Sequence, residues 1–244
     1  VPDRVGEGYG PNAPAIAELA QGHGLIICVD CGTLSHEPLA AAEGKAEVIV
    51  LDHHLGGETL PPAVAVVNPN RQDEDGALGH LCAAAVVFLC LVEANRQRRE
   101  AGLTPLPDLM GLLDLVALAT VADVAPLTGV NRALVRQGLK IMARRAHAGL
   151  SALADVAGVD RAPTPYHLGY LLGPRINAGG RVGRADLGAR LLACDDPAEA
   201  QSLAEKLDLL NKERRAIEAA VQEEALAQAE ARGLEAPLVW AAGE

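Results

Sequence analysis

A carboxylate and two imidazoles follow one another directly after a short apolar segment. Asp52, His53 and His54 come immediately after residues 48–51, an apolar run typical of a strand buried on both faces. Burying polar groups without partners is costly, and a divalent metal ion is the natural partner for adjacent carboxylate and imidazole groups. A mixed set of this kind favours Mn²⁺- or Mg²⁺-like ions over softer metals. The alternative is a surface loop in which both histidines are solvated.

Two further carboxylates stand at the ends of apolar segments. Asp30 follows residues 25–29, and Asp123 ends the apolar helical pattern of residues 115–122. The helix dipole disfavours negative charge at a C-terminus, so a cation near Asp123 would reverse that penalty. Each residue also has a simpler explanation: Asp30 can cap a helix in a strand-to-helix loop, and Asp123 can be exposed beyond a frayed helix end.

The segments around these residues have the spacing of a β-α-β unit. Strands are predicted at residues 25–29, 48–51 and 64–67, with a helix around residues 37–43. Parallel strands present functional residues at their carboxyl ends. We therefore expect Asp30 to lie beside Asp52 and His53.

The rest of the chain is predicted to be mainly helical. A Gly/Arg-rich loop is expected at residues 173–183, and helices are expected at residues 77–99, 108–121, 131–146, 151–156, 164–173 and 186–192. The predicted class is α/β, with a parallel sheet, an added helical region and a long connector helix. Residues 1–196 are expected to form the main domain, residues 197–235 the connector, and residues 236–244 the first strand of a further domain.

Charge and composition limit the functions that the chain can have. The formal net charge is −11, from 32 acidic and 21 basic residues, so the chain is a poor candidate for coating DNA non-specifically. Contact with nucleic acid would need local basic patches or bound cations. The longest uncharged apolar run, residues 81–92, is too short to span a bilayer, and no leader is visible. We expect a soluble, cytoplasmic protein without a membrane partner, whose five cysteines are reduced.

Two groups of basic residues are candidates for phosphate contact. Residues 173–184 combine glycines, which expose backbone N–H groups, with Arg175, Arg181 and Arg184. A helical stripe contains Arg132, Arg136, Lys140 and Arg144. A solvated surface explains the stripe equally well, and it is the simpler explanation of the loop.

Taken together, the ordered motifs resemble the DHH phosphoesterase superfamily and, more closely, its RecJ-type exonucleases. The resemblance covers nearly the whole chain and is carried by residues 1–10, 29–32, 52–54, 67–70, 114–126, 173–181, 207–211 and 241–244. It implies a DHH catalytic domain followed by a connector helix and the start of a DHHA1-type domain.

The resemblance also implies a role for each site residue. Asp30 matches a metal-bridging aspartate, and His53 and Asp123 match metal ligands. The catalytic residues would be His54, facing the phosphate, and Asp52, orienting the histidines. The implied cofactors are two divalent metal ions, Mn²⁺ or Mg²⁺, which hydrolyse a phosphodiester bond.

The implied substrate is single-stranded DNA, digested from its 5′ end to mononucleotides in DNA repair and recombination. Arg4, Arg175 and Arg181 are the expected contacts to DNA phosphates. A single-strand-binding protein or a helicase is a conceivable protein partner.

One departure from the family pattern concerns the metal site. RecJ-type proteins have another aspartate-rich strand end before the point that corresponds to Val1. We therefore expect this chain, by itself, to bind metal poorly and to cut little. Two alternatives remain open: another DHH phosphodiesterase, of the nanoRNase or cyclic-dinucleotide type, and an inactive RecJ-like scaffold.

Overall fold

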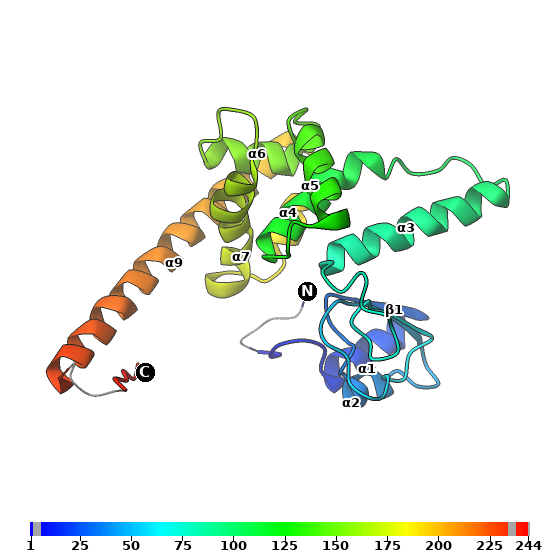
Figure 1. Cartoon of the computed structure of the whole chain (residues 1–244), viewed down its shortest axis with the longest axis horizontal. Coiled ribbons are helices and arrows are strands. Elements are labelled where there is room, and N and C mark those ends of the chain that lie inside the picture. Colours follow the sequence, from blue (N-terminus) through cyan, green and yellow to red (C-terminus); the bar gives the residue numbers. More distant parts are fainter. Residues whose placement is uncertain (2–5, 234–237, 244) are drawn as a thin grey trace.

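The computed structural model describes residues 1, 6–233 and 238–243, which form a sheet lobe and a helical lobe from which a long final helix extends (Figure 1). The elements of the sheet lobe are α1 (Ala13–Gly22), β1 (Leu25–Val29), α2 (His36–Ala40), β2 (Glu47–Leu51) and β3 (Ala65–Val67). The strands are parallel in the order β1-β2-β3. The predicted parallel sheet is thus confirmed.

Burial of the strands differs from the prediction. Ile26 and Cys28 of β1 are buried with the residues of α1 and α2, whereas Leu25, Ile27 and Val29 are exposed. The same alternation continues in β2, where Val48 and Val50 are buried. Strands covered on both faces were expected. Among the described residues only one face of β1 is covered, because both helices of this lobe lie on the same side.

The helical lobe contains nine helical segments in its described part. They are α3 (Ala83–Glu100), the short 3₁₀ turn η1 (Met110–Leu112), α4 (Leu113–Ala122), α5 (Gly129–Met142), α6 (Ala148–Val156), the π-helical segment η2 (His167–Leu172), α7 (Gly173–Val182), α8 (Leu187–Leu192) and α9 (Pro197–Arg232). Buried side chains of α4 to α9 form the largest core among the described residues, and those of α3 pack with α4 in a second core.

The Gly/Arg-rich segment is a helix and not the predicted loop. Residues 173–182 form α7 directly after η2. Two of the glycines allow close packing against α9: a Cβ on Gly179 would lie 3.1 Å from Leu207, and one on Gly183, directly after α7, would lie 2.6 Å from Leu210. The prediction was wrong because glycine permits a close approach between helices as well as a flexible turn.

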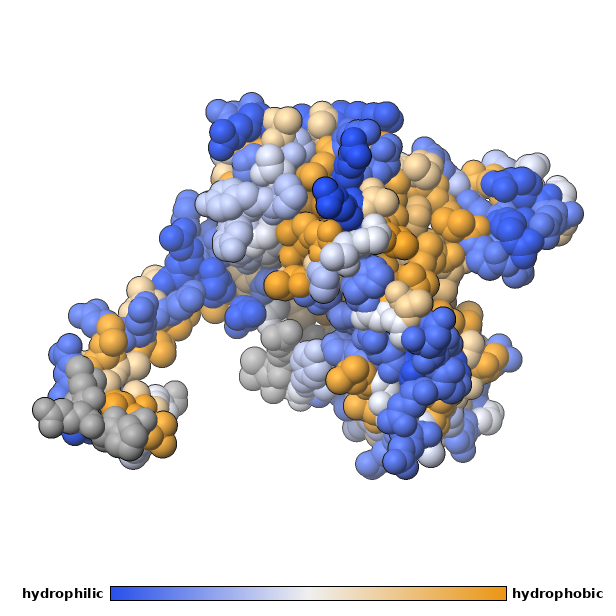
Figure 2. Space-filling view, in the orientation of Figure 1, coloured by the Kyte–Doolittle hydropathy of each residue, from blue (hydrophilic) through white to orange (hydrophobic). Residues whose placement is uncertain are grey.

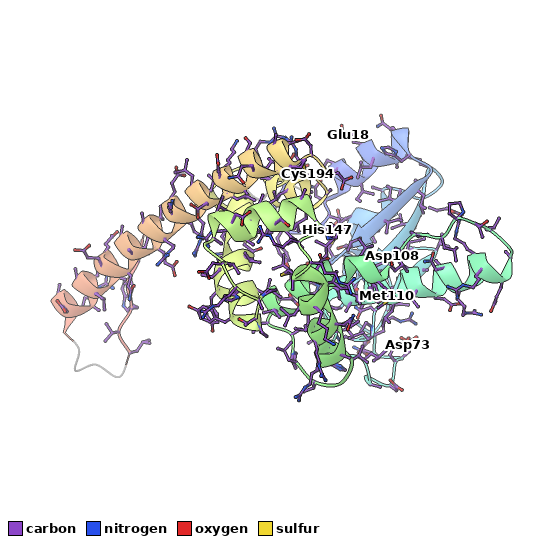
Figure 3. The ribbon with its side chains drawn as sticks, turned by 90° about the horizontal axis from the view of Figure 1, so that it is seen from above. Glu18, Asp73, Asp108, Met110, His147 and Cys194 are labelled. Atoms are coloured by element: carbon purple, nitrogen blue, oxygen red, sulfur yellow. The ribbon has the colours of Figure 1, made fainter. Side chains whose placement is uncertain are left out.

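The long final helix was predicted and is present as α9. Asp196 caps it by accepting a hydrogen bond from the Glu199 N–H, and Pro197 occupies the first turn. Its first half is buried in the helical lobe, and its second half leaves the body as a single helix (Figures 1 and 3). A connector to a further domain stays a prediction.

The predicted strand after α9 is absent from the described residues. Residues 238–243 have no regular secondary structure and lie against the end of α9, where the Arg232 guanidinium stacks on Trp240 and Gln228 bonds the backbone of Ala242. A strand needs a hydrogen-bonded neighbour, and no strand of the described part of the chain pairs with residues 238–243. Among the described helices, none is long and apolar enough to cross a membrane.

Candidate metal centre

Asp30 begins the site at the carboxyl end of β1. Its backbone continues the sheet, since its N–H donates to the Leu51 carbonyl, yet its φ of +61° is in the left-handed region that L-residues rarely adopt. Aspartate tolerates this region better than most residues. The strained turn leaves the carboxylate exposed and pointing toward His53, whose Nε2 is 3.2 Å from Asp30 Oδ1.

The ring of His53 is held in one orientation by the backbone of another lobe. Its Nδ1 lies 3.1 Å from the Leu81 carbonyl oxygen. A carbonyl can only accept, so Nδ1 carries the hydrogen and Nε2 of the neutral ring presents a lone pair. That lone pair faces a carboxylate oxygen of Asp30. Two acceptors so close together need a proton or a cation between them.

Asp52 forms hydrogen bonds with both histidines. It is buried, and its Oδ1 accepts hydrogen bonds from the His53 N–H and from His54 Nδ1 at 2.8 and 2.7 Å. Its Oδ2 accepts from the Thr33 N–H and hydroxyl. Burial alone would raise the pKa of Asp52, but the hydrogen bonds from Thr33 and His54 lower this pKa to about 2. Asp52 is therefore an anion whose Oδ1 binds the backbone of His53 and the ring of His54.

The hydrogen bond between His54 Nδ1 and Asp52 sets the orientation of the His54 ring. The hydrogen bond to Asp52 raises the pKa of His54 above its ordinary value, although partial burial opposes the shift. Since Nδ1 is engaged with Asp52, Nε2 is the nitrogen left to face the site. The ligand atoms of Asp30, His53 and His54 all lie within 4.8 Å of one another, as a metal centre requires.

Asp123 adjoins this group without completing it. It caps the C-terminus of α4, with its N–H donating to the Ala119 carbonyl. Its Oδ2 lies 3.7 Å from Nδ1 of His53, on the side of the ring that also contacts Leu81. The structure therefore brings Asp123 next to His53, but not into the compact set formed with Asp30 and His54.

These donors fit a divalent ion. Carboxylate oxygens and imidazole nitrogens suit Mn²⁺, and carboxylates suit Mg²⁺. Ligand atoms at ~2.1 Å from one octahedral ion are about 3 Å apart. The 3.2 Å between His53 Nε2 and Asp30 Oδ1 agrees with that spacing.

Sequence reasoning missed the polar residues that support the site. Asn68, buried after β3, donates to the Thr33 hydroxyl and to the His54 carbonyl. Asn70 donates to the His53 carbonyl at 2.6 Å. Residues 67–70 contributed only to the resemblance. Their place after the third parallel strand, at the same sheet edge as Asp30 and Asp52, was the signal that could have revealed them.

A groove leads from the metal centre to α7. Asp30 and Asn177 line two adjoining cavities of about 360 and 400 Å³. Asp123 lines the first cavity, and Arg181 lines the second.

The surface differs along α3 and α4. Apolar side chains gather over α4 and the inner part of α3, whereas the far end of α3 is hydrophilic (Figure 2).

The three arginines predicted to contact DNA differ in their placement. Arg181 is exposed near the end of α7 and lines the groove. Arg175 is largely buried and pairs with Asp208 of α9 at 2.9 Å, while donating to the Leu171 carbonyl. Its guanidinium therefore ties α7 to α9 in this structure. Arg4 lies outside the described residues.

Comparison with known proteins indicates a family. Residues 1–120 match the model of the DHH family, N-terminal domain. Asp30, Asp52, His53 and His54 lie within the matched residues, and Asp123 follows shortly after them, so the first part of the chain is similar to the DHH family.

The chain is similar to exonucleases named RecJ. It is 43% identical over 235 residues to "Single-stranded-DNA-specific exonuclease RecJ" of Dickeya dadantii and 41% identical to the protein of that name in Escherichia coli. Each alignment covers 93% of this chain but 41% of the relative, so the chain spans about two fifths of their length.

The chain is also similar to solved structures of RecJ. A crystal structure of exonuclease RecJ bound to manganese is 38% identical, with a TM-score of 0.82 over 93% of this chain and 57% of that one. RecJ of Thermus thermophilus in complex with Mn²⁺ is 37% identical, with a TM-score of 0.77 over 89% of this chain and 32% of that one.

Proposed function

We propose that the whole protein is a metal-dependent exonuclease that hydrolyses phosphodiester bonds of single-stranded DNA, releasing mononucleotides from the 5′ end in DNA repair and recombination. The convergence of Asp30, His53 and His54 at one sheet edge, within reach of Asp123, is the observation that carries this proposal. The similarity to RecJ structures with bound Mn²⁺ supports the choice of metal and reaction.

The proposal assigns some side chains of the site to metal binding and others to contact with phosphate. Asp30, His53 and Asp123 would hold divalent ions, Mn²⁺ or Mg²⁺. Bound there, such ions would supply a water that loses its proton near neutral pH and would neutralise charge on the phosphate. His54, whose Nδ1 is held by Asp52, would turn Nε2 toward a phosphate oxygen. Asp52 keeps that ring oriented.

The groove beside α7 is the proposed path of the DNA strand. Arg181 would bind a phosphate there, because a guanidinium forms strong charge-assisted hydrogen bonds with phosphate oxygens. Arg4 is proposed for the same role. Arg175 can take part only if it exchanges its pairing with Asp208 for a phosphate. A single-strand-binding protein or helicase as partner stays a proposal.

The test uses the full-length protein and single-stranded oligonucleotides labelled at either end, with Mn²⁺ present. We expect mononucleotides to appear from the 5′ end. Asp30→Ala, His53→Ala and Asp123→Ala should each reduce cleavage by about 10³-fold or more, because each removes several kcal/mol of transition-state stabilisation. His23→Ala, which changes an exposed histidine after α1, is the matched control and should cleave normally.

Three outcomes would contradict parts of the proposal. Normal turnover by one of the alanine variants removes that residue from the mechanism. Hydrolysis of dinucleotides without digestion of long strands indicates another DHH phosphodiesterase. No cleavage by the unmodified full-length protein in Mn²⁺ or Mg²⁺ indicates an inactive scaffold.

A further inference from the structure

Asn131 is a fully buried polar residue outside the metal centre. It lies in the first turn of α5 and has 0% exposure. A buried amide without partners is costly, so its hydrogen bonds indicate why a polar side chain occupies this position.

The amide nitrogen of Asn131 joins two segments that are far apart in the sequence. Nδ2 donates to the His80 carbonyl at 2.6 Å and to the Pro126 carbonyl at 3.0 Å. Oδ1 has no hydrogen-bond partner among the described residues. Exchanging the two amide atoms would set an oxygen against two carbonyl oxygens, so the contacts fix the orientation of the amide.

Each of these carbonyls is next to a contact of His53. The His80 carbonyl belongs to the peptide that leads into Leu81, and the Leu81 carbonyl accepts the hydrogen of His53 Nδ1 at 3.1 Å. Pro126 follows Asp123 by three residues, and Asp123 Oδ2 lies 3.7 Å from the same nitrogen. Asn131 thus restrains both segments that meet the Nδ1 side of the ring.

The turn between Asp123 and Pro126 needs such a restraint. Val124, directly after Asp123, has a φ of +58°, which is unfavourable for a β-branched residue. Strained backbone persists only where surrounding contacts fix it. The bond from Asn131 to the Pro126 carbonyl is one of those contacts, together with the bond from the Ala125 N–H to the Thr120 carbonyl.

We propose that Asn131 is a positioning residue for the metal centre. Its amide holds the Leu81 carbonyl where it keeps His53 in the tautomer with hydrogen on Nδ1, so that Nε2 presents its lone pair toward Asp30. It also holds the turn that places Asp123. The inference rests on the proposed function, because the reason to fix this tautomer is a metal ion at Nε2.

Two variants of Asn131 test the proposal in the full-length protein. Asn131→Asp keeps the shape of the side chain but removes the donors, and Asn131→Ala removes the side chain. Val135→Ala is the control for stability, since Val135 is buried one turn further along α5 and bonds neither carbonyl. Asn95→Ala is the control for an asparagine that donates to a proline carbonyl, Pro107, away from the site.

Two measurements distinguish positioning from stability alone. The first is the ¹⁵N spectrum of the His53 ring in metal-free protein at alkaline pH, where we expect one tautomer in the unmodified protein and a mixture in both Asn131 variants. The second is Mn²⁺ affinity by calorimetry below the unfolding temperature. It should fall about 10- to 100-fold, the usual effect of losing an outer contact of a metal ligand. Val135→Ala and Asn95→Ala should change neither.

Asn131 variants with an unchanged His53 tautomer and unchanged Mn²⁺ affinity would overturn the proposal, even if their unfolding temperature fell. A substantial loss of Mn²⁺ affinity in Val135→Ala would also overturn it, since general loosening of α5 would then be sufficient. If the proposed function is wrong, the unmodified protein would bind no Mn²⁺. The ¹⁵N spectrum of the metal-free protein would still show whether Asn131 fixes the His53 tautomer.

Discussion

At the scale of single residues, the site depends on hydrogen bonds that divide similar side chains into different roles. Asp30 and Asp52 both end parallel strands, but Asp30 is exposed and strained, whereas Asp52 is buried and satisfied by Thr33 and the histidines. Although most of the Asp30 side chain is exposed, partial desolvation is the main cause that raises its pKa, while hydrogen bonds hold the pKa of Asp52 low. A carboxylate with unused lone pairs is available to a metal ion, and a satisfied one is not.

The Asp52–His54 pair predicts a pH dependence of stability in metal-free protein. The folded pKa of His54 is raised, so its stabilising effect is complete below the unfolded value of 6.5 and is lost as pH rises through the higher folded value. Asp52→Asn should return the pKa of His54 toward 6.5 and reduce the loss of unfolding free energy above that pH. NMR titration of His54 and urea unfolding at several pH values measure both effects.

His23→Gln is the control for that pH dependence, because His23 is exposed and remote from Asp52. It should leave the titration of His54 unchanged. An unchanged pKa of His54 in Asp52→Asn would show that the buried carboxylate does not control this ring.

At the scale of elements, the placement of Asp123 depends on how closely α4 and α5 pack. Gly138 of α5 lies against the α4 backbone: a Cβ there would overlap the Leu113 carbonyl oxygen and lie 2.5 Å from the Ala117 Cβ. The missing side chain lets the two helices approach. Asp123 ends one of them, and Asn131 begins the other, so this approach determines how both reach the sheet lobe.

Gly138→Ala should therefore destabilise the protein and weaken the site. We expect a loss of about 1–3 kcal/mol in the free energy of unfolding, the usual effect of overpacking, together with weaker Mn²⁺ binding. Urea unfolding and calorimetry give the two values. Gly180→Ala is the matched control: no atom lies within 4 Å of its added Cβ, and replacing a helical glycine should stabilise α7 by about 0.5–1 kcal/mol. Equal stability of both variants would contradict the close contact.

At the scale of the whole molecule, the acidic charge must be reconciled with the proposed substrate, single-stranded DNA, which is a polyanion. The net charge of −11 repels DNA at long range, so binding has to come from local cations and from metal ions at the sheet edge. The groove between Asp30 and α7 provides such a place, with Arg181 along it. The basic stripe of α5, which includes Arg136, is the competing surface.

The salt dependence of binding distinguishes these two surfaces. Arg181→Ala should weaken binding of single-stranded DNA and make the slope of log affinity against log salt shallower by about 0.7, the contribution of one phosphate contact. Arg136→Ala should leave both quantities unchanged. Fluorescence anisotropy with a cleavage-resistant oligonucleotide at several salt concentrations provides the measurement, and the reverse result would place the DNA on α5.

The sequence alone determined which strands end in residues of the candidate metal centre. Apolar runs followed by Asp30 or Asp52 predict strand ends, and parallel strands bring their carboxyl ends to one edge, so this part of the site follows from local pattern. The ordered motifs were specific enough to indicate the family. The long charged pattern after Asp196 likewise predicted α9.

Only the tertiary structure decided the contacts between segments far apart in the sequence. Gly179, part of the segment predicted to be a loop, is buried in α7 against Leu207 of α9, and Arg175, expected to contact DNA, pairs with Asp208. The bonds from His53 to Leu81 and from Asn131 to His80 join residues 28 and 51 positions apart. The local sequence pattern indicates which face of a helix or strand is apolar. The hydrogen-bond partner of a buried polar atom depends instead on which distant segment of backbone packs against it.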